Sequence, residues 1–320
     1  MKSVSKAQPT SEAELPALVA ISGGRDSVVM LHWLILQGRK NLILCHLNHG
    51  LRGRESGQDV ALVRRLAKKY RLPCAIQKRE VAAFAKKHQL SLETAGRQLR
   101  HEFLFATAEK YGARTVFLAH HADDQAETIL ANLCRGSSTA GLAGMAEETR
   151  LTSGDRKILL QRPLLQWRRA EIDAYVLQHQ LIFREDSSNQ SLQHRRNRLR
   201  HQVLPLLNDI FGRDVAPIIA RLGRQAQRDD DALSEMADQL AKTHFSSDGS
   251  LLLTQTLHSE PFAVQSRLLQ TWLVEHLGLT GIENADIESA LGMLHPQGPA
   301  KVNLPKNRHL RRKSKRLWVQ

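Results

Sequence analysis

The apolar positions in the first half of the chain form short runs, separated by longer segments of helical periodicity. The short runs, which are typical of buried strands, are residues 15–21, 41–47, 74–78 and 115–120. The segments in which apolar residues recur every three or four positions are residues 26–37, 58–70 and 91–111. Strands that alternate with helices of this length predict βαβ crossovers. We therefore expect an α/β fold with a doubly wound parallel sheet, covered by helices on both sides.

The pattern changes near residue 203, where the strand–helix alternation stops. Residues 203–213 contain Pro205 and Gly212, and we interpret them as a domain border. The residues that follow are rich in helical periodicity and end in a basic, partly strand-like tail. The sequence thus predicts a larger domain at residues 1–212 and a smaller, helix-rich domain at residues 213–320.

Composition agrees with two packed domains. The chain has 320 residues, and 42% of them are apolar, which is enough for a core in each domain. No segment reaches about 18 uninterrupted apolar residues, and the first dozen residues contain no run of signal-peptide length. We expect a cytoplasmic protein without a membrane segment. The cysteines Cys45, Cys74 and Cys134 are scattered, so they indicate neither a disulfide framework nor a zinc or iron–sulfur site.

The net charge of +14 is concentrated in clusters, at residues 64–71, 194–201 and 308–316. Clusters of Lys and Arg are typical of proteins that bind nucleic acid. The alternative is a solvated helix face, which remains open above all for the first cluster.

The strand at residues 15–21 runs into a glycine pair and then into a helix, which is an arrangement typical of phosphate binding. Glycines let backbone N–H groups approach an anion, and the N-terminus of the helix adds a positive dipole. The alternative is a tight turn capped by a serine. The string Ser22-Gly23-Gly24-Arg25-Asp26-Ser27 resembles the PP-loop of the N-type ATP pyrophosphatases, which cleave ATP between its α and β phosphates. Neither a Walker A sequence nor GxGxxG is present.

The fourth predicted strand leads into a cluster of histidines and acids, HHADDQAET at residues 120–128. The helix that starts here places Asp124 and Glu127 one turn apart on one face, whereas Asp123 points elsewhere. Acids in a first helical turn also stabilise the helix through its dipole, which is the structural alternative. The position at the carboxyl end of a parallel strand favours a functional role, because ligands bind at that edge of such sheets.

Two further blocks mix acidic and basic residues. EDSSN at residues 185–189 precedes RRNRLR at residues 195–200, in which four of the six side chains are positively charged, as expected for contact with phosphates. In the second block, Glu93 lies four residues before Arg97, so pairing within one helix is as good an interpretation as a functional one.

These segments occur in the order found in the tRNA(Ile)-lysidine synthetase family, which this sequence resembles over residues 15–210. The matching segments are SGGRDS, HLNHGLRG, ETAGRQLRHEF, AHHADDQAET, the small-residue loop at 135–144, RPLL, and EDSSN followed by RRNRLR. The resemblance implies a ligase that uses ATP and Mg²⁺. The family joins L-lysine to C2 of the wobble cytidine in an isoleucine tRNA with a CAU anticodon, and it releases AMP and pyrophosphate.

Residues 213–320 resemble the tRNA-contacting C-terminal region of the family only weakly. Longer members carry a further C-terminal domain, which we expect this chain to lack. The resemblance therefore implies an ATP-dependent catalytic domain at residues 1–212 and a tRNA-contacting domain at residues 213–320.

The resemblance also implies roles for single residues. ATP would be bound by Arg97 and by the loop residues Ser22, Gly23, Gly24, Arg25, Asp26 and Ser27. Asp26 would hold Mg²⁺ and is expected to be catalytic. Arg97 or Arg196 would offset charge that develops during the reaction, and Arg195 and Arg200 would bind substrate.

The lysine substrate poses a proton problem, since at pH 7 only about one ε-amine in a few thousand is neutral. A carboxylate pair would bind the ammonium group but would also keep it protonated. We assign Asp124 and Glu127 to lysine recognition, through its ε- or its α-amino group, and either of them is a candidate acceptor for the proton.

Two other functions are compatible with parts of this pattern. One is a PP-loop tRNA thiolase, but such enzymes generally use paired or catalytic cysteines, and Cys134 is the only cysteine near a candidate site. The other is a non-catalytic RNA-binding protein on a degenerate nucleotide-binding fold, which the intact SGGRDS and DDQAET segments disfavour.

Overall fold

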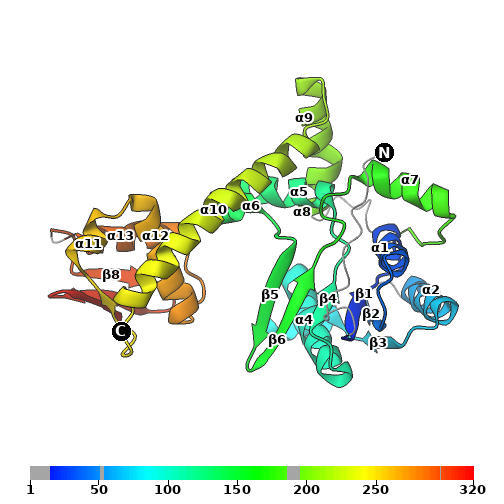
Figure 1. The fold of residues 1–320 in the computed structure, drawn as a ribbon, viewed down its shortest axis with the longest axis horizontal. Coiled ribbons are helices and arrows are strands. Elements are labelled where there is room, and N and C mark those ends of the chain that lie inside the picture. Colours follow the sequence, from blue (N-terminus) through cyan, green and yellow to red (C-terminus); the bar gives the residue numbers. More distant parts are fainter. Residues whose placement is uncertain (1–14, 51–53, 186–194, 296) are drawn as a thin grey trace. The chain divides into compact units, whose positions relative to one another are not determined.

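The computed structural model describes residues 15–50, 54–185, 195–295 and 297–320. The chain divides into two compact units (Figure 1). The first comprises Met1–Glu127 and Met145–Pro217, and the second comprises Thr128–Gly144 and Ile218–Gln320. In the part of the chain that the model describes, no helix is long and apolar enough to cross a membrane.

The first unit is built on a six-stranded sheet with the strand order β3-β2-β1-β4-β6-β5. Its strands are β1 (Ala17–Ala20), β2 (Leu42–Asn48), β3 (Cys74–Lys78), β4 (Thr115–Phe117), β5 (Glu148–Ser153) and β6 (Arg156–Gln161). All neighbouring strands run parallel except β5, which pairs antiparallel with β6 at the edge. The expected doubly wound, mostly parallel sheet is confirmed.

Helices cover both faces of this sheet (Figure 1). The helices of this unit are α1 (Arg25–Leu36), α2 (Arg54–Tyr70), α3 (Val81–His88), α4 (Leu92–Tyr111), the start of α5 (Ala122–Leu133), α7 (Arg169–His179), α8 (Arg195–Arg198) and α9 (Leu204–Phe211). Of these, α1, α2 and α7 pack on one face of the sheet and α4 packs on the other. Between α8 and α9 lies a π-helical segment, η3 (Leu199–Val203).

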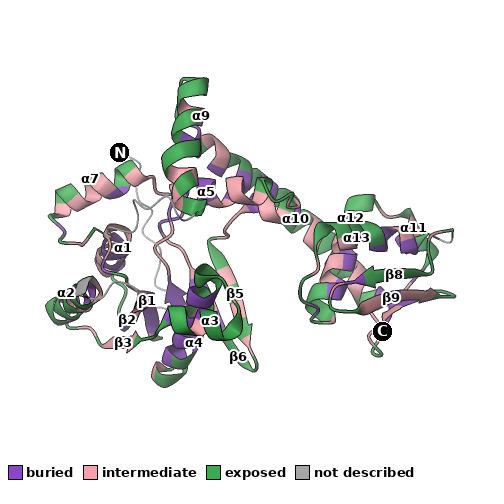
Figure 2. Ribbon diagram, turned by 180° about the vertical axis from the view of Figure 1, so that it is seen from behind, coloured by how far each residue is buried: buried purple, intermediate pink, exposed green. Residues whose placement is uncertain are grey.

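The central strand β1 shows why the chain folds in this way, because three of its four residues are buried (Figure 2). Leu18 and Val19 are both fully buried. Leu18 belongs to a core that also contains Phe103 and Leu104 of α4. Val19 belongs to a second core, with side chains of α1, α2 and α7. A strand that alternates between two apolar cores reads as a continuous apolar run in the sequence.

The second unit pairs helices with a small antiparallel sheet of order β7-β10-β9-β8. Its strands are β7 (Leu251–Leu252), β8 (Lys301–Leu304), β9 (Arg308–Lys313) and β10 (Arg316–Val319). Its helices are α6 (Thr139–Ala143), α11 (Gln255–Ser259), α12 (Phe262–Gln270) and α13 (Asn284–Leu291), and most of the long helix α10 (Ala216–His244) belongs to it as well. After α12 the chain continues as the π-helical segment η4 (Thr271–His276), and after α13 as the short 3-10 helix η5 (Gly292–Leu294). The fully buried Trp272 lies in the core between these helices and the sheet.

Candidate functional site

The loop after β1 is held in shape by its two serines. Ser22 Oγ accepts a hydrogen bond from the Gly24 N–H (3.1 Å), and Ser27 Oγ donates to the Gly24 carbonyl (2.8 Å). Gly23 has a φ of +91°, which L-residues with a Cβ rarely adopt. Gly24 is then the extended N-cap of α1. The glycine pair therefore turns the chain from strand into helix and leaves the helix N-terminus available to an anion.

Asp26 lies in the first turn of α1 and is half-buried. Its nearest ion-pair contacts are His121 Nε2 at 3.8 Å and Arg169 Nη1 at 3.8 Å. Among the described residues, no hydrogen-bond partner reaches the buried Asp26 Oδ1. Burial raises the pKa of Asp26, and the neighbouring Asp124 adds to that rise. An under-coordinated carboxylate oxygen suits Mg²⁺, which usually takes one or two protein carboxylates together with substrate phosphates.

Arg25, the residue before Asp26, contacts another part of the unit. Its guanidinium forms an ion pair with Asp173 of α7 and stacks over Phe183 at 5.6 Å from the ring centroid. In this structure the side chain therefore joins α1 to α7.

His121 brings the loop after β4 to the loop after β1. This imidazole is 1% exposed. Its Nε2 lies 3.5 Å from Asp124 Oδ2 and 3.8 Å from Asp26 Oδ2, and its Nδ1 lies 3.6 Å from Asp123 Oδ2. Burial alone would lower the pKa of His121, but the three carboxylates raise it above its usual value. Sequence reasoning missed this residue, although the His-His pair before Asp-Asp at a strand end was a usable signal.

Asp124 and Glu127 form one cluster with Arg196 and Arg200. The cluster joins the acidic segment at residues 120–128 to the basic segment at residues 195–200. Glu127 is 1% exposed, and its two oxygens each accept a 2.6 Å hydrogen bond, one from Arg196 Nε and one from Arg200 Nε. Asp124 Oδ1 lies 2.8 Å from Arg196 Nη2 and 2.9 Å from Arg200 Nη2. Burial raises the pKa of Asp124, but His121 and the two guanidiniums outweigh it, and the net shift is downward.

Asp123 faces a different set of partners. It accepts hydrogen bonds from Arg168 Nε (3.2 Å) and Nη2 (3.0 Å), and from the Arg169 N–H (2.9 Å). Burial raises its pKa, but His121 and Arg168 dominate and lower the pKa of Asp123 to about 2. Asp123 therefore joins the start of α5 to the start of α7.

The other predicted site residues are more exposed than the two carboxylates of this cluster. Arg97 is on the exposed side of α4, and Arg195 is exposed at the start of α8. Arg162, from the RPLL segment, donates to His120 Nδ1 at 3.2 Å. Burial lowers the pKa of His120 to about 4, so this imidazole is neutral near pH 7. Glu185 of EDSSN is described, whereas residues 186–189 lie outside the described residues.

Comparison with known proteins gives three results. Residues 2–207 match a family model described as PP-loop domain. The tRNA(Ile)-lysidine synthase of Geobacter sulfurreducens is 40% identical over 259 residues, which cover 78% of this chain and 53% of that protein. The enzyme of the same name from Dehalococcoides mccartyi is 36% identical over 300 residues, covering 90% and 62%. The chain thus spans between about half and about three-fifths of the length of these curated relatives.

A solved structure shares the fold. The U34-tRNA thiolase NcsA from Methanococcus maripaludis, with its 4Fe-4S cluster, superposes with a TM-score of 0.52 at 18% identity. The match covers 67% of this chain and 71% of that one. At this identity the likeness concerns the fold alone.

Proposed function

Because the chain belongs to the PP-loop domain family, which implies ATP binding, we propose that it acts as a tRNA(Ile)-lysidine synthetase. In this reaction the wobble cytidine of an isoleucine tRNA with a CAU anticodon is adenylated at its C2 oxygen, and pyrophosphate leaves. The lysine ammonium first loses one proton; the neutral amine then attacks C2, AMP leaves with the oxygen, and the nitrogen now bonded to C2 loses a second proton. The observation that carries the proposal is the convergence of loop 22–27, the acids of residues 123–127 and two arginines of residues 195–200.

We assign ATP binding to the loop after β1. Ser22, Gly23, Gly24 and Ser27 present backbone groups at the N-terminus of α1, where the helix dipole favours the pyrophosphate. Asp26 would hold Mg²⁺ through Oδ1, which accepts no hydrogen bond from the described residues, and bound Mg²⁺ would supply charge neutralisation for the phosphates. Arg25 and Arg97 complete the assignment, although Arg25 reaches ATP only if it leaves Asp173.

Lysine recognition is assigned to Asp124 and Glu127. Both carboxylates are already paired with guanidiniums, so a lysine ammonium must take the place of Arg196 or Arg200. The displaced guanidinium would then be available for a phosphate of ATP or RNA. When an ammonium replaces a guanidinium, the net charge around the buried carboxylates does not change, so neither carboxylate is left without a cation. A cluster of two acids and two arginines is therefore suited to a cationic substrate.

The remaining arginines are assigned to charge stabilisation and to RNA. Arg196 would offset charge that develops on the phosphate of the adenylated intermediate, as Arg97 could from α4. Arg195 and Arg200 would contact the tRNA, and residues 213–320 would form its second contact region. The ranges 1–212 and 213–320 remain our proposal for the catalytic and tRNA-contacting domains.

A thiolase is the less favoured function. Cys45 is buried, and burial raises the pKa of its thiol to about 12, so it is a poor nucleophile. The similarity to a thiolase is limited to the fold, whereas the relatives at 36–40% identity are lysidine synthases. A purely RNA-binding protein would have no need of the paired acids beside the ATP loop.

The test of this function is lysine transfer. The chain is incubated with ATP, labelled lysine and a transcript of the isoleucine tRNA with CAU, and label on the RNA is measured. We expect label that depends on ATP and that disappears when the wobble cytidine is replaced by uridine. Label on neither transcript, or equal label on both, would contradict the proposal.

A further inference from the structure

The small sheet of the second unit has one apolar face and one basic face. On β9 and β10, Leu310 and Leu317 are fully buried against the helices. Because side chains alternate along a strand, the intervening residues point to the opposite face. That face carries the cations Lys301 on β8, Arg311 and Lys313 on β9 and Arg316 on β10, together with Asn303, His309 and Trp318.

Trp318 is a large aromatic side chain outside the apolar core. It is only partly buried, and it lies directly opposite Arg311 in the strand register. Trp272 provides the contrast, since it is fully buried and its indole N–H donates to the Gly249 carbonyl at 3.1 Å. Among the described residues, no hydrogen bond to the Trp318 indole is found.

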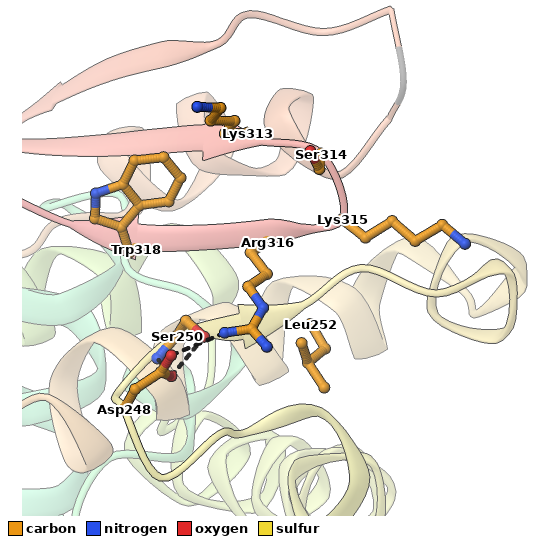
Figure 3. Close-up of a pocket in the computed structure, with 8 residues that line it drawn as sticks. All are labelled: Asp248, Ser250, Leu252, Lys313, Ser314, Lys315, Arg316 and Trp318. Atoms are coloured by element: carbon orange, nitrogen blue, oxygen red, sulfur yellow. Dashed lines mark hydrogen bonds and ion pairs between the residues drawn. The ribbon is translucent and has the colours of Figure 1, made fainter.

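Trp318 and Arg316 line one hollow of about 820 Å³ (Figure 3). A hollow of this size is in the range of small-ligand sites. Its other lining residues are Asp248, Ser250, Leu252, Lys313, Ser314 and Lys315. Asp248 accepts from Ser250 Oγ (2.6 Å) and Ser250 N (3.0 Å) and pairs with Arg316 at 2.9 Å. The dashed lines in Figure 3 mark these contacts, which place the Arg316 guanidinium beside Asp248 at the hollow.

The charges that line the hollow indicate which kind of partner it binds. Lys313, Lys315 and Arg316 line the hollow and only one acid does, so an anionic partner is favoured. Trp318 lies two residues from Arg316 on the same strand. An aromatic ring at this distance from a cation can stack on an unpaired base while the cation contacts the adjacent phosphate. A lipid surface or an acidic protein would pair with the cations, but a single partly buried indole would add little binding energy to either contact.

We propose that this face of the sheet binds single-stranded RNA, with Trp318 stacking on an unpaired base and Lys313 and Arg316 contacting the flanking phosphates. The inference rests on the proposed function in that the natural partner would be an unpaired segment of the tRNA. Its test needs neither ATP nor lysine, so failure of lysine transfer would not affect it.

The experiment measures binding of the full chain to a short unstructured RNA and to a blunt RNA duplex, by fluorescence anisotropy over a salt series. Trp318→Leu should weaken binding of the single strand about tenfold and leave the salt slope unchanged, because no charge is lost. Trp318→Phe should restore most of the affinity. Duplex binding should be the same for all three proteins, since paired bases cannot stack on the ring.

Phe262→Leu is the matched control, because Phe262 is an exposed aromatic residue of α12, in the helical layer of the same unit. We expect it to bind both RNAs as the wild type does. Equal single-strand affinity of Trp318→Leu and wild type would overturn the proposal. So would an equal loss of affinity for the duplex or for vesicles of anionic lipid, since either result would make the face a general anion-binding surface.

Discussion

At the scale of single residues, the site is organised by charges that compensate one another. His121 lies among three carboxylates, and Asp124 is shared between this imidazole and two guanidiniums. A carboxylate in such a position is held ionised despite its burial, since the surrounding cations outweigh desolvation. We propose that it accepts the lysine ammonium in exchange for a guanidinium.

We expect Asp124→Asn to separate the two half-reactions. The amide keeps the shape of the side chain but removes the charge that lysine would pair with. Adenylation of the tRNA should persist, measured as pyrophosphate release in a single turnover, while lysine transfer falls by at least about a hundredfold, the loss expected for about 3 kcal/mol. Loss of ATP binding in this variant would instead place Asp124 in the nucleotide site.

At the scale of secondary-structure elements, the acids of α5 join it to its neighbours. Glu127 connects α5 to α8 and η3 through Arg196 and Arg200. Glu127→Gln leaves Asp124 as the one carboxylate of the cluster for two guanidiniums, and removing one partner of a buried ion pair costs roughly 3 to 5 kcal/mol. Since the Arg196 and Arg200 side chains are 46% and 26% exposed, water can rehydrate them, and we expect the lower end, about 3 kcal/mol.

Urea unfolding of the Glu127→Gln variant tests this value. The control is Glu109→Gln, which removes the exposed ion pair with Arg156 and should cost less than about 1 kcal/mol. If both substitutions cost the same, the Glu127 cluster does not hold these elements together.

Asp123 connects α5 to α7, and its contribution should depend on pH. Its pKa of about 2 in the folded protein lies below the usual value near 3.9, so the folded state binds the proton less tightly. The stabilisation is present above about pH 4 and is lost as the pH falls through about 2. Asp123→Asn should therefore cost about 2 kcal/mol at pH 7 and about half of that at pH 3.

The measurement is urea unfolding of this variant and of the wild type at both pH values. Asp155→Asn, in an exposed turn, is the control and should change neither value. A cost for Asp123→Asn that does not vary with pH would show that its ion pair with Arg168 adds no stability.

Local signals account for the elements that could be predicted. Helix α4 begins and ends as expected, because Ser91 accepts from the Thr94 N–H and Gly112 adopts φ +65°. Helix α3 has no side-chain cap and ends at Gln89, a left-handed non-glycine residue, so no such signal was available. Strand β5 is polar and partly exposed, so it has no apolar run that would predict a strand, and it is stabilised by its pairing with β6. Residues 204–211, expected at a domain border, form α9.

The site was predictable in its residue types but not in its pairings. Strand ends bring the loops of residues 22–27 and 120–127 together, which follows from a parallel sheet. No local pattern in the sequence connects Arg196 and Arg200 to Asp124 and Glu127, because the two pairs lie about 70 residues apart in the chain.

At the scale of the whole molecule, the basic tail should contribute to tRNA affinity through phosphates. The tail cations are not equivalent, since Arg312 points to the apolar side and donates to the Met293 carbonyl (3.1 Å) and the Gly298 carbonyl (2.6 Å). A test should therefore replace Arg311, Lys313 and Arg316 and leave Arg312 in place.

We expect the triple alanine variant to lower the slope of log affinity against log salt by about two, because each phosphate contact contributes roughly 0.7 to 0.9. Affinity for all tRNAs should fall alike, while preference for the CAU anticodon should persist, since it would depend on unstacked bases near the site in the first unit. The measurement is tRNA affinity across a salt series. An unchanged slope would mean that the RNA does not contact this face.

On the proposed function, the first unit cleaves ATP between its α and β phosphates to activate a tRNA. The most direct measurement is the identity of the nucleotide products when the full chain is given ATP, lysine and the isoleucine tRNA with CAU. We predict AMP and pyrophosphate in equal amounts, dependent on the tRNA, and no release from Asp26→Ala, although that variant should remain folded by circular dichroism. ADP and phosphate from the wild type, or undiminished pyrophosphate release from Asp26→Ala, would show that the loop of residues 22–27 does not direct cleavage between the α and β phosphates.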